Sequence, residues 1–529
     1  MRRKLRLLIS KQQFTMQAIV PPHSNLITDF VFPSGHGKFQ KILLGVSGMV
    51  YATCAISTTT LSFVLPSAQC DFHLSSADKG KLSAMPLIGM IFGCSLWGSV
   101  ADCYGRKVAI ILALIVDFLA AVISSTMYSL PLFLTCRFFS GFGIIGATSI
   151  IFSYLGEFLL VKHRDAVLGR LEIFWNVGMI VLPGVAWAFL NSAMLSLLSG
   201  NGQFASWRIF VLVCSLPSLI SVVMLCFMPE TPKFLISKGR YDEAKNVFRR
   251  MFASNTGRAM CFYPVSTLEG ECENNNSFKF NSKTPVMFRV AEKCKKVRYL
   301  ISELFSPPYL KFLGVTCFAD FGLMASYYTL IMWFPEIFAR FSDFELKHPN
   351  RTATICEVSQ HAVKQYEKFF YVVPCDPTIG SKVFIDTIII GLSCFPTSVS
   401  LSYLIKKIGK KSVLVTGLIM SGLATLLLNF VESPTQTLIL SCIFEALTGI
   451  METVIFCVVV DLFPTNLRAI ALSTTATCGR LGAIFGNVAF GFLIDINCVI
   501  PIYLFAFLLI ASAILCLAVP RNESYITLH

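Results

Sequence analysis

Long apolar runs recur along nearly the whole chain, and they restrict the fold more than any other feature. One run, Val108 to Met127, carries Asp117 as its only formal charge. A helix of this length, at about 1.5 Å per residue, reaches roughly 30 Å, the thickness of the hydrocarbon core of a bilayer. Core helices of a soluble protein do not recur at this length and this often. We therefore predict an all-α membrane protein.

The spacing of the runs predicts about twelve spanning helices. We place them at 42–65, 82–101, 108–128, 131–155, 167–191, 207–228, 310–334, 382–405, 412–431, 435–461, 468–494 and 499–519. Lys and Arg gather in alternate loops, which is the bias of cytosolic loops. An even number of spans then puts both termini in the cytosol. The net charge of +14 follows this alternation and forms no single patch, so we predict no nucleic-acid partner.

The spans divide the chain into two bundles. The predicted parts are a cytosolic tail (1–41), a six-helix bundle (42–228), a cytosolic linker (229–308), a second six-helix bundle (309–519) and a cytosolic tail (520–529). Within the second bundle, the loop 336–380 is expected to face the lumen or the exterior.

This outer loop carries two sites of covalent modification. It contains a glycosylation sequon at Asn350 and the cysteines Cys356 and Cys375. Because the compartment is oxidising, we predict glycosylation of Asn350 and a Cys356–Cys375 disulfide. Cys70 and Cys498 also lie near the outer face and are alternative partners. The cysteines show no metal-ligand spacing, so no metal site is predicted.

An internal repeat fixes the architecture. Glycine, acid and base positions recur in the two halves at a constant separation of 304 residues. The pairs are Gly105 with Gly409, Glu157 with Asp461, Arg164 with Arg468, and Gly178 with Gly482. Two halves of six spans in the same orientation form the parallel repeat of the major facilitator fold.

The loop after the second span carries a motif of this superfamily. Gly98-Ser-Val-Ala-Asp-Cys-Tyr-Gly-Arg-Lys107 matches G-x-x-x-D-x-x-G-R-[KR] at every defined position. We expect Gly98 to permit close helix approach, Gly105 to permit a tight turn, and Asp102 to pair with a cation across the interface. The predicted cytosolic latch comprises Gly98, Asp102, Gly105, Arg106, Lys107, Glu157, Arg164, Asp461 and Arg468. The alternative is static pairing at helix ends.

Several segments resemble the synaptic vesicle glycoprotein 2 family. They are Cys136–Gly146, Phe152–Leu159, Ser206–Cys214, Pro229–Phe234 and Ser326–Pro335. The resemblance implies a major facilitator transporter or vesicle glycoprotein. The chain departs from the family in its short 336–380 loop and in the absence of carboxylates from its first helix, so any role of those acids is in doubt.

A candidate transport site follows from charges inside spans, which usually face a cavity or a partner. The resemblance implies that the first, fourth, seventh and tenth helices line the cavity. The candidate residues are Arg137, Glu172, Trp175, Asp320, Tyr327, Tyr328, Glu445, Thr448 and Glu452. Such a cavity suits a cationic or polar organic solute. For Arg137, a structural pairing with a nearby acid is an equal alternative.

The function predicted is a secondary-active or facilitative transporter, and not an enzyme. No phosphate-binding loop is recognisable, so we expect no cofactor and a gradient of H+ or Na+ as the energy source if transport is coupled. The alternative is a vesicle glycoprotein that acts as a scaffold or receptor without transport. The predicted protein is a monomer in the plasma membrane or in a vesicle membrane.

Overall fold

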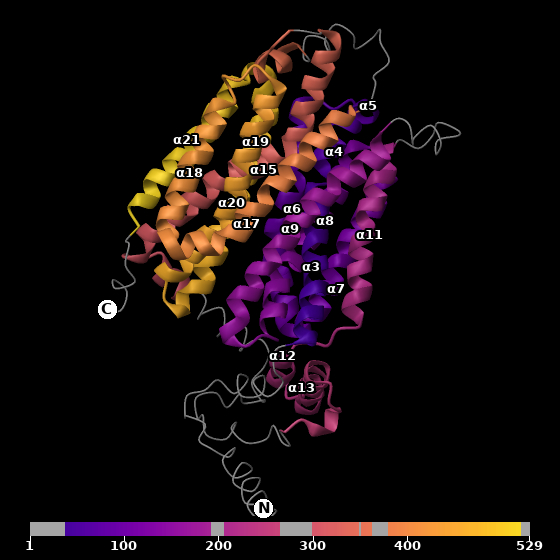
Figure 1. The fold of residues 1–529 in the computed structure, drawn as a ribbon, viewed down its shortest axis with the longest axis vertical. Coiled ribbons are helices and arrows are strands. Elements are labelled where there is room, and N and C mark those ends of the chain that lie inside the picture. The colour runs from indigo at the N-terminus through magenta and orange to yellow at the C-terminus, as the bar shows by residue number, and fades with distance from the viewer. Residues whose placement is uncertain (1–36, 192–205, 265–298, 349–350, 362–378, 520–529) are drawn as a thin grey trace, which may run out of the picture.

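The structure is a computed structural model, and it describes residues 37–191, 206–264, 299–348, 351–361 and 379–519. Twelve helices in this part of the chain are long and apolar enough to cross a membrane. They stand side by side in two lobes, one from each half of the chain (Figure 1). The chain is therefore an all-α, multi-pass integral membrane protein.

The first lobe is built from the N-terminal half. Its helices are α3 (Lys38–Thr59), α4 (Leu61–Ser67), α5 (Gln69–Phe72), α6 (Ser76–Tyr104), α7 (Arg106–Ser125), α8 (Leu130–Gly156), α9 (Val161–Leu190) and α11 (Ser206–Cys226). The first span is a composite of α3 and α4, which meet at Thr60. Short helices follow at the cytosolic end: α12 (Pro232–Ser237), α13 (Tyr241–Thr256) and the 3-10 turn η1 (Met260–Phe262).

The second lobe repeats this arrangement. Its helices are α15 (Tyr309–Lys347), α17 (Ser381–Ile408), α18 (Lys410–Leu427), α19 (Pro434–Leu462), α20 (Thr465–Asn497) and α21 (Val499–Leu517). Helices α18, α19 and α20 each begin 304 residues after α7, α8 and α9. The separation found in the sequence is thus the separation between equivalent helices.

Two repeat-related glycines end the second helix of each half. Gly105 has a φ of +112° and Gly409 a φ of +89°, in a region that L side chains rarely adopt. Each caps one helix and begins the next with no intervening loop. The tight turn expected at Gly105 is confirmed.

Several helices extend beyond the apolar runs that predicted them. Helix α6 begins at Ser76, where the Ser75 side chain accepts a hydrogen bond from the Asp78 amide as an N-cap. Helix α15 continues to Lys347, so the first part of the predicted 336–380 loop is helical. A span predicted from hydropathy ends at the first charged residues, whereas a helix continues as long as its backbone hydrogen bonds do.

The predicted disulfide is wrong in its second partner. Cys356 is bonded to Cys498, with the two Cα atoms 5.3 Å apart and a sequence separation of 142. Cys498 lies at the junction of α20 and α21, and the fold brings it to the outer loop. Pairing depends on Cα separation and not on proximity in the sequence. Cys70 is disulfide-bonded as well, whereas Cys375 and Asn350 lie outside the described residues.

Candidate transport site

A cavity lies between the two halves. Its walls come from the first, fifth, seventh, eighth and tenth spans. The polar lining includes Thr59, Asn176, Tyr327 and Glu445. Glu445 is buried, and its Oε2 atom has no hydrogen-bond partner. The cavity thus presents one available carboxylate oxygen among aromatic and hydroxyl groups.

The outer side of this cavity is covered by aromatic rings from both halves. Phe63 of α4 stacks on Phe384 of α17, with ring centroids 5.8 Å apart. Across the middle of the interface, the Asn176 amide donates a hydrogen bond of 2.7 Å to the Ser398 hydroxyl. These contacts join the halves beside and outside the cavity.

A second polar layer lies toward the cytosolic side. Tyr51 donates a 3.2 Å hydrogen bond to Glu172, and its ring lies 5.3 Å from that of Trp175. Glu172 is also within electrostatic range of Glu452 in the opposite half. The layer therefore brings together acids from both halves.

Arg480 of α20 is the cation of this second layer, and it was not among the predicted residues. Its guanidinium donates a 2.7 Å hydrogen bond to the Tyr328 hydroxyl and lies 3.9 Å from Glu452. The Arg480 and Glu452 side chains are 15% and 29% exposed, so neither is completely buried. Arg480 lies inside the predicted span 468–494, and charges inside spans usually mark sites. It was missed because the eleventh helix was not among the helices expected to line the cavity.

Two of the predicted residues lie near this layer without an observed binding contact. Asp320 of α15 is completely buried and is within electrostatic range of Arg480 and Glu452. Thr448 is buried and donates its hydroxyl back to the Phe444 carbonyl at 2.8 Å. The Thr448 hydroxyl is therefore hydrogen-bonded to the backbone of its own helix and does not face the cavity.

Arg137 is not part of the site, which corrects its assignment. It is buried inside the N-terminal half, where it donates to the Ser124 hydroxyl and lies 5.0 Å from the Phe133 ring centre. Asp117 is the acid within its electrostatic range. Helix α8 contributes no residue to the cavity lining described above. The structural alternative for Arg137 therefore accounts for its position.

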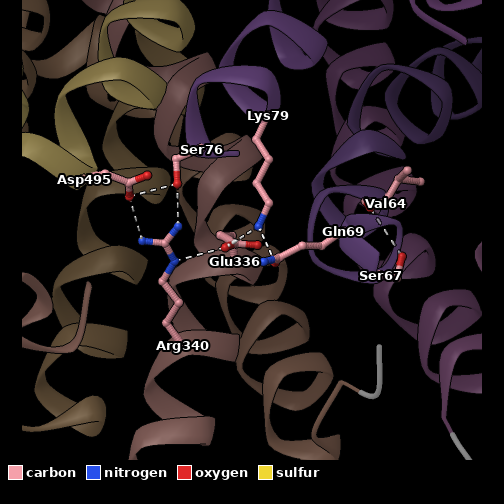
Figure 2. A network of polar contacts seen from close by, with 8 residues as sticks. All are labelled: Val64, Ser67, Gln69, Ser76, Lys79, Glu336, Arg340 and Asp495. Carbon is pink, nitrogen blue, oxygen red and sulfur yellow. Dashed lines mark hydrogen bonds and ion pairs between the residues drawn. The ribbon is translucent and has the colours of Figure 1, made fainter. Parts of the chain in front are cut away.

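An ion-pair network joins the two halves on the outer side (Figure 2). The Lys79 ammonium lies 2.6 Å from Glu336, and both side chains are almost completely buried, at 1% and 4% exposure. Arg340 contacts Glu336 at 3.0 Å and donates to the Ser76 hydroxyl at 2.9 Å. Asp495 accepts from Ser76 at 2.9 Å. We call these five residues the outer network.

The sequence did not predict the outer network because its charges lie beyond the apolar runs. Lys79 precedes the expected start of its span at residue 82, and Glu336 and Arg340 follow the expected end at 334. The N-cap pair Ser75 and Asp78 was the available signal for a longer α6.

The predicted latch residues pair within each half. Arg106 contacts Asp102 at 3.2 Å and Glu157 at 3.3 Å, and Asp461 contacts Lys410 at 2.6 Å. These ion pairs at the cytosolic end do not join the halves. The Asp102 side chain is 75% exposed, so its expected pairing across the interface is not present in this conformation.

Other latch residues have local roles. The backbone amide of Lys107 donates to Glu230, and its ammonium donates to the Cys226 carbonyl at 2.9 Å. A Cβ atom on Gly98 would meet no atom within 4 Å, so the expected close helix approach at Gly98 is not found. The Arg164 guanidinium packs beside Gly156, and Arg468 has a buried Nε without a hydrogen-bond partner.

The distribution of contacts defines an inward-facing conformation. Across the described chain, the polar contacts between halves lie in the outer network and beside the cavity. The paired charges at the cytosolic end remain within their own halves. The second polar layer is consequently accessible from the cytosolic side.

Comparisons with known proteins agree with this architecture. The family described as "Sugar (and other) transporter" matches residues 39–264, and "Major Facilitator Superfamily" matches 384–527. The xylose transporter XylE from E. coli, in a partially occluded inward open conformation, superimposes with a TM-score of 0.64 at 16% identity, covering 92% of this chain and 98% of XylE. The nucleoside transporter NupG gives 0.54 at 12% identity, covering 90% of this chain and 98% of NupG.

The relatives found by sequence are vesicle glycoproteins. Human synaptic vesicle glycoprotein 2B is 27% identical over 93% of this chain and 85% of its own length. Rat synaptic vesicle glycoprotein 2A is 33% identical over 57% of this chain and 42% of its own length.

Two lobes of six spans around a polar cavity make the major facilitator fold, the fold of membrane transporters, and one transporter family model matches each half of the chain. The chain is similar over most of its length to the synaptic vesicle glycoprotein 2 proteins.

Proposed function

We propose that the chain carries a small polar organic solute, with organic cations as the preferred class, by alternating access. The observation that supports this most directly is Glu445, a buried carboxylate in the cavity between the halves with one unpartnered oxygen. A cation there would gain a charge-assisted hydrogen bond or an ion pair. Tyr327 and Phe63 supply ring faces for the apolar part of the solute.

The outer network and the cytosolic latch are proposed as the two gates of this cycle. The outer network closes the outer side of the cavity in the inward-facing conformation. The latch acids and bases, which now pair within their halves, would join the halves when the outside opens. We propose that the energy comes from a gradient of H+ or Na+. We further propose that the protein is a monomer and that it resides in a vesicle membrane, because its relatives are named as synaptic vesicle glycoproteins.

Uptake by reconstituted vesicles tests the proposed function. We expect the wild type to accumulate at least one member of a panel of organic cations and neutral sugars. Glu445→Gln should reduce cation uptake roughly 10- to 100-fold, the equivalent of one hydrogen bond to a charged group. Glu432→Gln is the matched control, because this exposed carboxylate lies in the α18–α19 connection outside the cavity.

The outcomes separate the candidate functions. A sugar that is transported equally by wild type and Glu445→Gln would favour a neutral solute, for which the hydroxyl and amide lining of the cavity is also suited. A wild type that transports no solute of the panel would favour the scaffold or receptor function instead.

A further inference from the structure

Asp320 differs from the other buried acids of the described chain. It is 0% exposed, and neither of its carboxyl oxygens has a hydrogen-bond partner. Asp117, by contrast, accepts from three serine hydroxyls, and Glu336 is paired with Lys79 and Arg340. Burying an unpaired carboxylate costs so much free energy that such a group binds a proton instead. The geometry of Asp320 is therefore that of a neutral carboxylic acid.

The groups around Asp320 include one cation. Arg480 and Cys478 face it from α20, and Glu452 faces it from α19. On its own helix, the neighbouring titratable groups are Cys317 and Tyr328. Helices α4 and α21 also pack on α15, and neither contains an Asp, Glu, Lys, Arg or His. The acids and bases of α17 lie near its two ends.

Arg480 is the cation near both Glu452 and Asp320. Its guanidinium contacts the Tyr328 hydroxyl and Glu452, and not Asp320. Gly479, the residue before Arg480, places the α20 backbone directly against Asp320, since a Cβ there would lie 2.9 Å from the Asp320 carboxyl carbon. Arg480 follows Gly479 on α20 and lies within electrostatic range of Asp320.

We propose that Asp320 is a proton-binding site and that Arg480 is its movable counter-charge. In the inward-facing conformation, Asp320 holds the proton while Glu452 balances Arg480. When Arg480 turns to Asp320, the carboxyl O–H bond breaks and the proton passes to water in the exposed Arg480–Glu452 layer. The carboxylate left behind is balanced by the guanidinium, and Glu452, which loses this partner, is 29% exposed and can be solvated.

The chemistry of the surroundings favours a proton over a metal ion. Na+ would need several oxygen ligands, whereas Glu452 is the one other acid of the described chain within electrostatic range of Asp320, and the Arg480 guanidinium cannot ligate a cation. Within the described residues, no cluster of three or more His, Cys, Asp or Glu side chains could hold a metal ion.

Infrared spectroscopy of the purified protein tests proton binding without any transport. A protonated carboxylic acid without hydrogen bonds has a distinct C=O stretching band. We expect this band in the wild type at neutral pH, its loss in Asp320→Asn, and its retention in the control Glu432→Gln. Asp320→Glu should keep a band at a shifted frequency, so loss of fold in one variant does not decide the result. A wild-type spectrum without a band that depends on Asp320 would overturn the proposal.

Coupling of the proton to transport rests on the proposed function, and vesicle assays separate the two. In Asp320→Asn, a pH gradient should no longer drive accumulation, while exchange of labelled for unlabelled solute persists at a reduced rate. If the wild type exchanges solute but ignores the pH gradient, the coupling is wrong and the proposed function stands. If the wild type exchanges no solute, the proposed function fails, and the infrared band alone decides proton binding.

Discussion

At the scale of single residues, Asp117 shows how a charge inside a span can serve stability. Its carboxylate accepts hydrogen bonds of 2.6–2.8 Å from Ser57, Ser140 and Ser218, which lie on α3, α8 and α11. We expect Asp117→Ala to lower stability by about 3 kcal/mol, because it leaves Arg137 without its neighbouring acid. Ser218→Ala should cost about 1 kcal/mol, since it removes one donor. Equal unfolding midpoints for both variants and the wild type in denaturant titrations would contradict this role.

The same scale shows what the sequence could predict about the site. The cost of charges in a bilayer selected Glu445, which lines the cavity, and also Glu172 and Glu452, which lie within electrostatic range of one another. The rule does not tell which neighbour a charge will find, so it could not separate Arg137, which lies inside one half, from Arg480, which lies between the halves. That distinction depends on the rotation of each helix about its own axis.

At the scale of helices, the two halves use equivalent glycines for close packing. A Cβ on Gly178 would lie 2.6 Å from the Ala52 carbonyl oxygen, and one on Gly482 would lie 2.9 Å from backbone atoms of Phe321. Each glycine thus abuts the first helix of its own half. We expect Gly178→Ala and Gly482→Ala each to cost about 1–3 kcal/mol through overpacking.

Gly184 of α9 is the control for this prediction, because a Cβ there would meet no atom within 4 Å. Gly184→Ala should be neutral or should stabilise by up to about 1 kcal/mol, as expected from helix propensity alone. If unfolding experiments rank the three variants alike, close packing is not the reason for the glycines at 178 and 482.

The separation of 304 between these glycines was readable from the sequence, and the fold supplies its physical cause. Helix ends were less predictable. Helix α15 continues thirteen residues past the expected end of its span at 334, because its outer part packs inside the protein and not against lipid. Charged residues such as Glu336 therefore remain helical and buried.

At the scale of the whole molecule, the outer network holds the two halves in the inward-facing conformation. Lys79 and Glu336 come from opposite halves and are both buried, so Lys79→Met removes the ion pair between the halves and leaves Glu336 with Arg340 of its own half. We expect Lys79→Met to shift the population toward an outward-open conformation by about tenfold, given the loss of about 1.5 kcal/mol for a hydrogen bond between charged groups. Labelling of Cys394, a native cavity residue, by a membrane-impermeant maleimide from the outside measures this shift.

Two further variants distinguish the network from a general effect of charge on α6. Lys81 lies two residues along the same helix, but its ion pair with Asp78 is within one half and its contact with the other half is with the Phe492 ring at 5.7 Å, so Lys81→Met should raise Cys394 labelling much less than Lys79→Met. The double variant Lys79→Met with Glu336→Met replaces the buried pair by two apolar side chains and leaves Arg340 with Asp495, so labelling should return toward the wild-type level. If Lys79→Met labels like the wild type, the halves are held together on the outside by apolar contacts such as Phe63 on Phe384, and the ion pairs only set their register.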